Sequence, residues 1–147
     1  EVDLAIKLSK SEFRGQESLT VIVDDIKFSG LDNKLLIDEQ RVYESIKRNE
    51  QVNSKLLQEH TPSRADFSVL YKFLKANNPI NIDISVLYYR LKDFKISFCK
   101  LLIMLDAMAE CVLITMETSA DMYSINVNPV NGKVDLESSV IMKFLRK

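Results

Sequence analysis

The sequence predicts an α+β protein, and three changes in the spacing of its apolar residues support this fold class. Apolar and polar residues alternate over residues 2–28, which is the period of a half-buried strand. Between residues 63 and 109 the apolar residues recur every three or four positions, as in helices that bury one face. The alternating pattern returns over residues 112–127. We therefore expect a β-hairpin, a set of helices and a second hairpin, in that order.

Two strands account for the first 28 residues. Their apolar positions are Val2, Leu4, Ile6 and Leu8 in the first strand, and Leu19, Val21 and Val23 in the second. The polar stretch 9–18, which contains Gly15, is expected to form the loop. Asp24 and Asp25 are expected to interrupt the second strand, and Asp25 to end it. An isolated two-stranded hairpin is marginally stable in water. Because the chain also opens on Glu1 rather than on Met, we expect a piece of a longer protein.

Residues 29–61 are polar, with few apolar positions. Val42 and Ile46 lie four residues apart, and a second apolar pair follows at Leu56 and Leu57. This pattern predicts one or two short helices with a narrow apolar stripe, either bridging two domains or lying across one. Pro62 ends the segment, because proline disfavours the helical conformation of the residue before it. We therefore predict a polar helical linker.

A well-delimited helix follows the linker. Ser63 and Asp66 match the pattern of an N-cap with an acid in the first turn, where the helix dipole favours negative charge. Asn77, Asn78 and Pro79 are expected to end the helix. Its apolar residues are Phe67, Leu70, Tyr71 and Leu74, and a short strand with Ile80 and Ile82 follows it.

Two more helices, a hairpin and a closing helix complete the chain. Ser85 is predicted to cap a helix that runs through Leu91, and Ser97 to cap the next one. The apolar face of that helix holds Phe98, Leu101, Leu102, Leu105, Met108 and Ala109. The hairpin has Val112, Ile114 and Met116 on one strand, a polar turn over 118–121, and Tyr123, Ile125 and Val127 on the other. The closing helix spans about 136–145, with Val140, Ile141, Phe144 and Leu145 facing inward.

The order helix, short strand, helix, helix, hairpin is that of a winged helix. Three short helices need a cover over one end of their core, and the hairpin supplies it. We therefore predict that residues 62–147 form a winged-helix-like domain. Helical structure through residues 113–126 would contradict this assignment.

Composition favours a globular chain. Of the 147 residues, 46% are hydrophobic and 28% are charged, as in ordinary globular domains. No apolar run approaches the ~18 residues that span a bilayer, and no signal-peptide pattern is visible. Cys99 and Cys111 would lie ~18 Å apart on one helix, too far for a disulfide. We therefore expect two buried free thiols in a cytoplasmic protein without membrane contact.

The net charge of −1 conceals a small asymmetry. Residues 1–60 hold 9 Lys or Arg and 12 Asp or Glu, whereas residues 61–147 hold 11 and 9. Neither part is the strongly basic domain that by itself indicates nucleic-acid binding. Any contact with DNA is therefore expected to be local.

Two sequence patterns carry a family resemblance. Residues 8–28 show the pattern Leu-x-x-Asn-x-(aromatic)-x-Gly-x-x-x-(apolar)-x-(apolar), followed by Asp and Ile, at Leu8, Phe13, Gly15, Leu19, Val21, Asp25 and Ile26, with Ser11 in place of Asn. Residues 62–83 show the pattern Arg-x-x-Phe-x-x-Leu-Tyr-x-(aromatic)-Leu at Arg64, Phe67, Leu70, Tyr71, Phe73 and Leu74. Together with residues 97–117 and 134–145, they resemble the C-terminal region of the RecJ family of single-stranded-DNA-specific exonucleases.

The resemblance implies a fold and a function. It implies that residues 1–28 are closing strands of an oligonucleotide-binding barrel, and that residues 62–147 are the C-terminal domain found in Gram-positive RecJ proteins. The family consists of 5′-to-3′ exonucleases of DNA repair and recombination, which use Mn or Mg bound by Asp and His. Its Asp-His-His and Gly-rich His-containing motifs are absent here, because the chain has one His and three Gly. We therefore expect a non-catalytic region without a cofactor or metal of its own.

The resemblance also implies partners. These are single-stranded DNA and, as protein partners, the nuclease core, a helicase or a single-strand-binding protein. A free-standing winged-helix regulator that reads one duplex sequence is the alternative. An independent enzyme is disfavoured, because no His, Cys or acidic residues converge in the pattern.

Two clusters of residues are candidate nucleic-acid contacts. Cations hold phosphates and aromatic side chains stack on bases in single-strand binders. The first cluster is Lys7, Lys10, Phe13 and Arg14, for which the alternative is a solvated loop over a buried Phe13. The second is Arg90, Lys92, Lys95 and Lys100, at the start of the expected recognition helix. That helix is strongly apolar, which disfavours base readout and leaves phosphate contact or partner docking open.

Three other features favour structural roles. Asp24 and Asp25 are adjacent in a strand and should point to opposite faces, so that they do not converge on a metal. His60 stands in the linker without a Cys, Ser or acid at catalytic spacing, and is expected to be solvated. The side chains of Tyr88, Tyr89, Met116 and Met122 are expected to pack in the core or hairpin, with an exposed protein-binding patch as the alternative.

Overall fold

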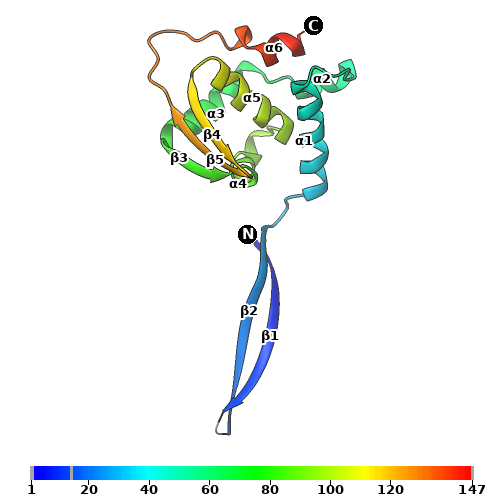
Figure 1. The fold of residues 1–147 in the computed structure, drawn as a ribbon, viewed down its shortest axis with the longest axis vertical. Coiled ribbons are helices and arrows are strands. Elements are labelled where there is room, and N and C mark those ends of the chain that lie inside the picture. Colours follow the sequence, from blue (N-terminus) through cyan, green and yellow to red (C-terminus); the bar gives the residue numbers. More distant parts are fainter. Residues whose placement is uncertain (1, 14, 147) are drawn as a thin grey trace. The chain divides into compact units, whose positions relative to one another are not determined.

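The computed structural model describes residues 2–13 and 15–146, without the side chains of Phe13 and Lys27. Its described residues form an N-terminal β-hairpin, six α-helices and a three-stranded antiparallel sheet (Figure 1). The predicted α+β class is therefore confirmed. The chain divides into two compact units, residues 1–32 and 33–147.

The first unit is a long hairpin. Strand β1 (Val2–Phe13) pairs with the antiparallel strand β2 (Gln16–Phe28), and Phe13 lies opposite Gln16. The strands therefore run through the polar stretch that the sequence assigned to the loop. Ser11 and Ser18, whose hydroxyl oxygens are 2.7 Å apart, continue the cross-strand pairing there.

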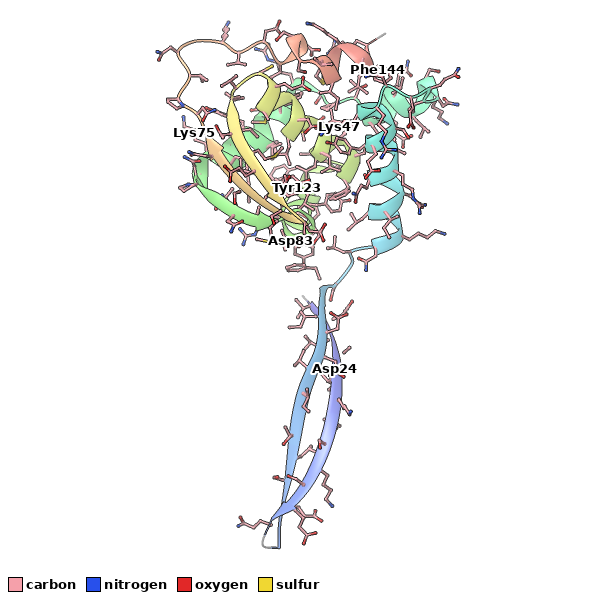
Figure 2. All side chains as sticks on the ribbon, in the orientation of Figure 1. Asp24, Lys47, Lys75, Asp83, Tyr123 and Phe144 are labelled. Carbon is pink, nitrogen blue, oxygen red and sulfur yellow. The ribbon has the colours of Figure 1, made fainter. Side chains whose placement is uncertain are left out.

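A β-bulge lies at Asp24 in β2. Ala5 is paired with Asp25 and Ile6 with Val23, so that Asp24 is the extra residue of its strand (Figure 2). A bulge bends a strand and lets it continue. The strand is therefore interrupted at the predicted place, but the prediction that Asp25 ends it is wrong, since β2 extends to Phe28.

The register of the hairpin separates an apolar face from a mostly polar one, because directly paired residues share a face. The apolar face holds Val2, Leu4, Ile6, Leu8, Leu19, Val21, Val23 and Ile26. These side chains are 47–66% exposed.

The second unit begins with α1 (Asn33–Lys47) and α2 (Ser54–His60). Residues 33–61 of the segment assigned to a linker therefore lie within this unit, and α1 packs against α5 (Phe98–Glu110). Ile46 is 1% exposed and belongs to the main core. The sequence left open whether this segment bridges two domains or lies across one. In the structure, α1 lies across the second unit.

Helix α3 (Arg64–Ala76) starts as predicted. The Ser63 hydroxyl accepts the Asp66 N–H at 3.2 Å, and the Asp66 carboxylate accepts the Ser63 N–H at 2.8 Å. Strand β3 (Ile80–Asp83) and helix α4 (Ile84–Arg90) follow. The N-cap of α4 is Asp83 and not Ser85, because Asp83 accepts the N–H groups of Ser85 and Val86. The prediction for Ser85 is therefore wrong by two residues.

A 3-10 turn, η1 (Lys92–Phe94), leads into α5, which Ser97 caps as predicted. Nine of the residues of α5 are buried, including Cys99, Ile103, Met104 and Ala107, outside the single face that the sequence predicted. The helix is therefore the centre of the core.

Strands β4 (Ile114–Ser119) and β5 (Met122–Val127) form the predicted hairpin, with strand order β3-β5-β4 in the sheet (Figure 1). Val112 lies outside β4, with a positive φ of 56°.

The predicted closing helix is two elements. A 3-10 turn η2 (Leu136–Ser138) precedes α6 (Val140–Leu145), because Ser139 leaves the helical conformation and caps α6. Ile141 and Leu145 are buried as predicted, whereas Val140 is 67% exposed. The prediction that Val140 faces inward is therefore wrong.

The two cysteines are free. Cys99 is buried within α5, whereas Cys111 is the partly exposed C-cap of that helix, which corrects the prediction of two buried thiols. No helix in the described part of the chain has the length and apolar character that crossing a membrane requires.

Candidate nucleic-acid interface

The hairpin does not bring its predicted cations together. Lys7 is paired with Ile22 and Lys10 with Leu19, so that the two lysines lie on opposite faces of the ribbon. Lys10 also forms an ion pair with Glu17, with 2.6 Å between Nζ and Oε1. Arg14 and the side chain of Phe13 lie outside the described residues. The described hairpin therefore offers two separate lysines, one of them paired with an acid.

The second predicted cluster is compact. We use the name basic loop for Arg90, Lys92, Phe94 and Lys95, which connect α4 to α5. Helix α4 ends at Arg90, and the N–H of Phe94 donates to the carbonyl of Leu91 at 3.0 Å in the η1 turn. Leu91 and Ile96 are buried on either side of the turn. These two anchors hold the residues between them at the surface.

This turn carries one exposed aromatic ring and three exposed cations. Phe94 is 55% exposed, although large aromatic side chains usually gain by burial. Arg90, Lys92, Asp93 and Lys95 are exposed in the same turn, and no described acid forms an ion pair with the three cations. The Lys92 Nζ lies 4.1 Å from the centroid of the Tyr89 ring, within cation–π range. Residues 90–95 thus present three cations, one acid and an open aromatic ring on one short connection.

Sequence reasoning missed Phe94 at this site. Its signal was present as the local alternation Tyr89-Arg90-Leu91-Lys92-Asp93-Phe94-Lys95, in which aromatic and cationic residues interleave. The short spacing keeps these residues on one connection between two helices. Leu91 and Ile96 are buried on either side of it, whereas Phe94 is exposed.

Lys100 is less exposed than the rest of its predicted cluster. It lies in the first turn of α5, partly buried, and its N–H donates to the Ser97 hydroxyl at 3.2 Å. Helix α1 covers this end of α5, because the Glu39 carboxylate accepts the Cys99 N–H at 2.8 Å. Helix α5 therefore has little free surface with which to read a DNA groove.

A polar contact also fixes α1 to α5. The Tyr43 hydroxyl donates to the Asp106 carboxylate at 2.6 Å, and Lys47 Nζ lies 2.9 Å from the same carboxylate. Burial first, and then the hydrogen bond to Asp106, raise the pKa of Tyr43 above its usual value. The phenol is therefore held in its neutral, donating form, in a structural role.

The remaining sequence candidates have structural surroundings. His60 is 7% exposed and its Nδ1 lies 3.2 Å from the Ser97 hydroxyl, so the expectation of a solvated histidine is wrong. Tyr88 packs edge to face on Phe98, with 5.5 Å between ring centroids. Met116 and Met122 lie on opposite faces of the sheet. Met116 is paired with Ile125 and shares its face, whereas Met122 lies three residues from Ile125 along β5 and therefore on the other face.

No metal centre forms in the described part of the chain. Over residues 2–13 and 15–146, no three His, Cys, Asp or Glu side chains gather as a metal ion requires. Asp25 instead accepts the N–H of Ile26 at 2.8 Å.

Comparison of the chain with protein-family models, with curated proteins and with solved structures found no match. The residues of the site are therefore the basis on which a function is argued.

Proposed function

We propose that this chain is a non-catalytic, single-stranded-DNA-binding region of a RecJ-like exonuclease, and that the basic loop holds the strand. The observation that carries the proposal is the half-exposed Phe94 ring in the same short connection as the exposed Arg90, Lys92 and Lys95. Bases stack on aromatic faces without regard to sequence, while nearby cations attract the phosphates. The loop combines both features on a connection anchored by the core.

The arrangement of the elements supports the fold part of the proposal. Helices α3, α4 and α5 with strands β3, β4 and β5 follow one another in the order of a winged helix, and β3 lies beside β5 in the sheet. The open apolar face of the hairpin is what closing strands of an oligonucleotide-binding barrel would present to the rest of that barrel. The proposal assigns the hairpin to such a barrel.

The alternative, a free-standing regulator that reads duplex DNA, is less well supported. A recognition helix presents Arg, Asn, Gln or Ser to base edges. Most of α5 is buried, and α1 lies against it.

The proposal also concerns metals and partners. The Mn or Mg of the proposed parent exonuclease would belong to catalytic domains other than this region. The protein partners of this region would be the nuclease core, a helicase or a single-strand-binding protein.

Salt-dependent binding of a fluorescent dT20 oligonucleotide tests the proposal. Replacing Phe94 with Ala should weaken binding about tenfold, because one stacked base contributes ~1–3 kcal/mol. Replacing Lys92 and Lys95 with Ala should lower the slope of log affinity against log salt by ~1.4, or ~0.7 for each lost phosphate contact. Fluorescence anisotropy over a range of salt concentrations measures both quantities.

The matched control replaces two exposed lysines of other helices, Lys55 and Lys143, with Ala. It should leave binding near the wild-type value at each salt concentration, beyond a small loss of overall charge. Wild-type affinity and slope in both basic-loop variants would refute the proposal. A preference for one duplex sequence over dT20 would favour the regulator.

A further inference from the structure

A groove runs along one side of α3. Three adjoining cavities of about 390, 310 and 390 Å³ make it up. The first two share Arg64 and Phe67, and the last two share Tyr71 and Val130. Because Arg64, Phe67, Tyr71 and Lys75 are spaced by three or four residues, they lie on one face of the helix. We call this surface the α3 groove.

The middle of the groove is apolar. Phe67 and Leu113 are buried at its floor, and Val134 and Leu136 are partly exposed along the opposite wall. Val130, at the junction with the third cavity, is 37% exposed. A cavity of about 310 Å³ is of the size that receives a large apolar side chain with part of its backbone.

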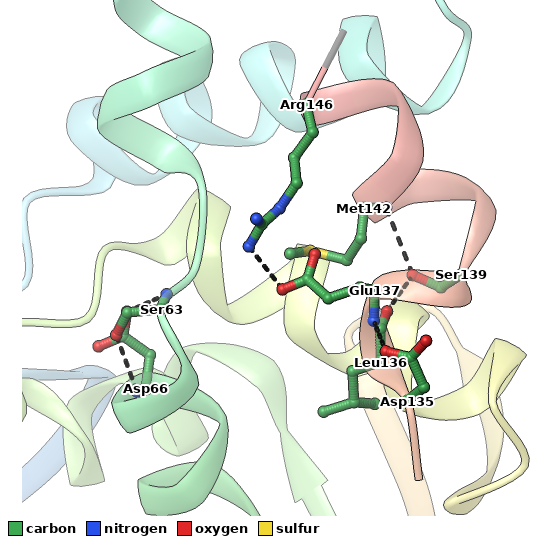
Figure 3. A network of polar contacts seen from close by, with 8 residues as sticks. All are labelled: Ser63, Asp66, Asp135, Leu136, Glu137, Ser139, Met142 and Arg146. Atoms are coloured by element: carbon green, nitrogen blue, oxygen red, sulfur yellow. Dashed lines mark hydrogen bonds and ion pairs between the residues drawn. The ribbon is translucent and has the colours of Figure 1, made fainter.

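The acids around the groove already have partners (Figure 3). Asp66 accepts from the N–H of Ser63 at 2.8 Å, and Asp135 accepts from the N–H of Glu137 at 3.1 Å. The Glu137 carboxylate forms an ion pair with Arg146, with 2.5 Å between Oε1 and the guanidinium. Among the described residues, none of these carboxylates forms an ion pair with Arg64 or Lys133.

Two cations of the groove lack such partners. Among the described residues, no hydrogen bond or ion pair engages the side chain of Arg64 or of Lys133, and both residues are exposed. Arg64 lines the first and second cavities and Lys133 the first. The groove thus combines an apolar centre with two unpaired cations at one end, where Asp135 and Glu137 also line the cavity and where the Arg64 guanidinium can bind a carboxylate in a bidentate manner.

We propose that the α3 groove docks a peptide segment of a partner protein in which a large apolar side chain lies beside Asp or Glu. The apolar side chain occupies the central cavity over Phe67 and Leu113, and the carboxylate pairs with Arg64. A nucleic-acid strand fits less well, because the apolar centre of the groove offers no partner to its regularly spaced phosphates. The proposal uses residues other than the basic loop and does not rest on the proposed function.

A peptide-display selection on the full chain tests this proposal. Random dodecapeptides are selected on the wild-type protein, and the enriched sequences are synthesised with a fluorescent label. The selected peptides should combine Asp or Glu with Phe, Leu, Ile or Trp. On binding to the ¹⁵N-labelled protein, they should shift the amide signals of α3 and of residues 129–137.

Two variants link the peptides to the groove. Arg64→Glu should weaken their binding about tenfold, because it removes one charge-assisted contact and puts a negative charge in place of the positive one. Folding is expected to be kept, because Arg64 is exposed in the first turn of α3, where an acid suits the helix dipole. Val130→Asp should weaken binding as well, by placing a charge beside the apolar centre. The matched control, Lys55→Glu, changes the charge equally on α2 and should leave peptide binding unchanged.

The other outcomes overturn the proposal. These are a selection without enrichment of acidic and apolar residues, peptides whose affinity survives both groove variants, and amide shifts confined to the hairpin. Perturbation of the groove amides by dT20 would assign the surface to nucleic acid instead. Since Arg64→Glu leaves the basic loop intact, dT20 binding by this variant separates a failure here from a failure of the proposed function.

Discussion

Cys99 illustrates how burial at a single residue couples stability to pH. The thiol is buried in α5, and burial followed by the charge of Glu39 raises its pKa from the usual 9.0 to about 12. The folded state therefore holds a proton that the unfolded chain releases above pH 9. Its contribution to stability is fully present below pH 9 and is lost as the pH rises from 9 toward 12.

We predict that the free energy of unfolding falls by about 1.4 kcal/mol per pH unit for this group in that window. The raised pKa values of Tyr43, Tyr88 and Tyr123 add to the loss above pH 10, their usual value. Between pH 9 and 10, the Cys99 thiol therefore contributes more than the three tyrosines to the pH dependence of the free energy of unfolding. Chemical unfolding under reducing conditions at pH 8, 9 and 10 gives the slope.

Replacing Cys99 with Ala should flatten the slope between pH 9 and 10, whatever its effect on absolute stability. The matched control is Ile103→Val, a small change at a fully buried residue of the same helix that does not titrate. It should keep the wild-type slope. An unchanged slope in the Cys99 variant would show that this thiol does not couple to folding.

The start of α5 shows how one hydroxyl connects two elements. The Ser97 hydroxyl accepts the Lys100 N–H and also lies 3.2 Å from Nδ1 of the buried His60, at the end of α2. Ser63 caps α3 in a more exposed position, with Asp66 as its partner. The two serines therefore differ in whether a buried polar group depends on them.

We predict that Ser97→Ala destabilises the protein more than Ser63→Ala does. Loss of a cap costs about 1 kcal/mol, and leaving His60 without its partner adds about 1–3 kcal/mol. Chemical denaturation at neutral pH compares the two variants. Equal losses would mean that the His60 contact contributes nothing. The double variant His60→Ala with Ser97→Ala measures the coupling directly, since neighbours that interact do not lose stability additively.

At the scale of the whole molecule, the two units differ in how they are stabilised. The core runs from Ile46 to Leu145 and lies entirely in residues 33–147. The hairpin is held by its backbone pairing and exposes its apolar face. A two-stranded ribbon without a covered face is marginally stable.

We therefore predict that residues 33–147 fold without the hairpin, and that a peptide of residues 1–32 does not form stable strands in water. The shorter chain should keep cooperative unfolding and a midpoint close to that of the full chain. It should also bind less of a dye that reports exposed apolar surface, because the open face is removed. Circular dichroism and dye fluorescence measure these properties. Loss of cooperative unfolding in the shorter chain would show that its core depends on the hairpin.

The sequence by itself determined the features whose causes are local. The α+β class, both hairpins and the caps at Ser63 and Ser97 were predictable, because alternation and capping depend on residues a few positions apart. The cations of the basic loop were predictable for the same reason. The sequence predicted Ser85 as the cap of α4, whereas the structure has Asp83. Both residue types suit an N-cap, so the local pattern did not distinguish them.

Tertiary structure decided what each surface can do. Helix α1 lies over α5, which turns an expected recognition helix into the centre of the core, and its Glu39 and Tyr43 contact residues about 60 positions away. The α3 groove likewise needs a wall from residues 127–137. Such contacts depend on how apolar faces from distant parts of the chain share one core. No local pattern specifies that choice, because many pairs of faces are apolar enough to pack.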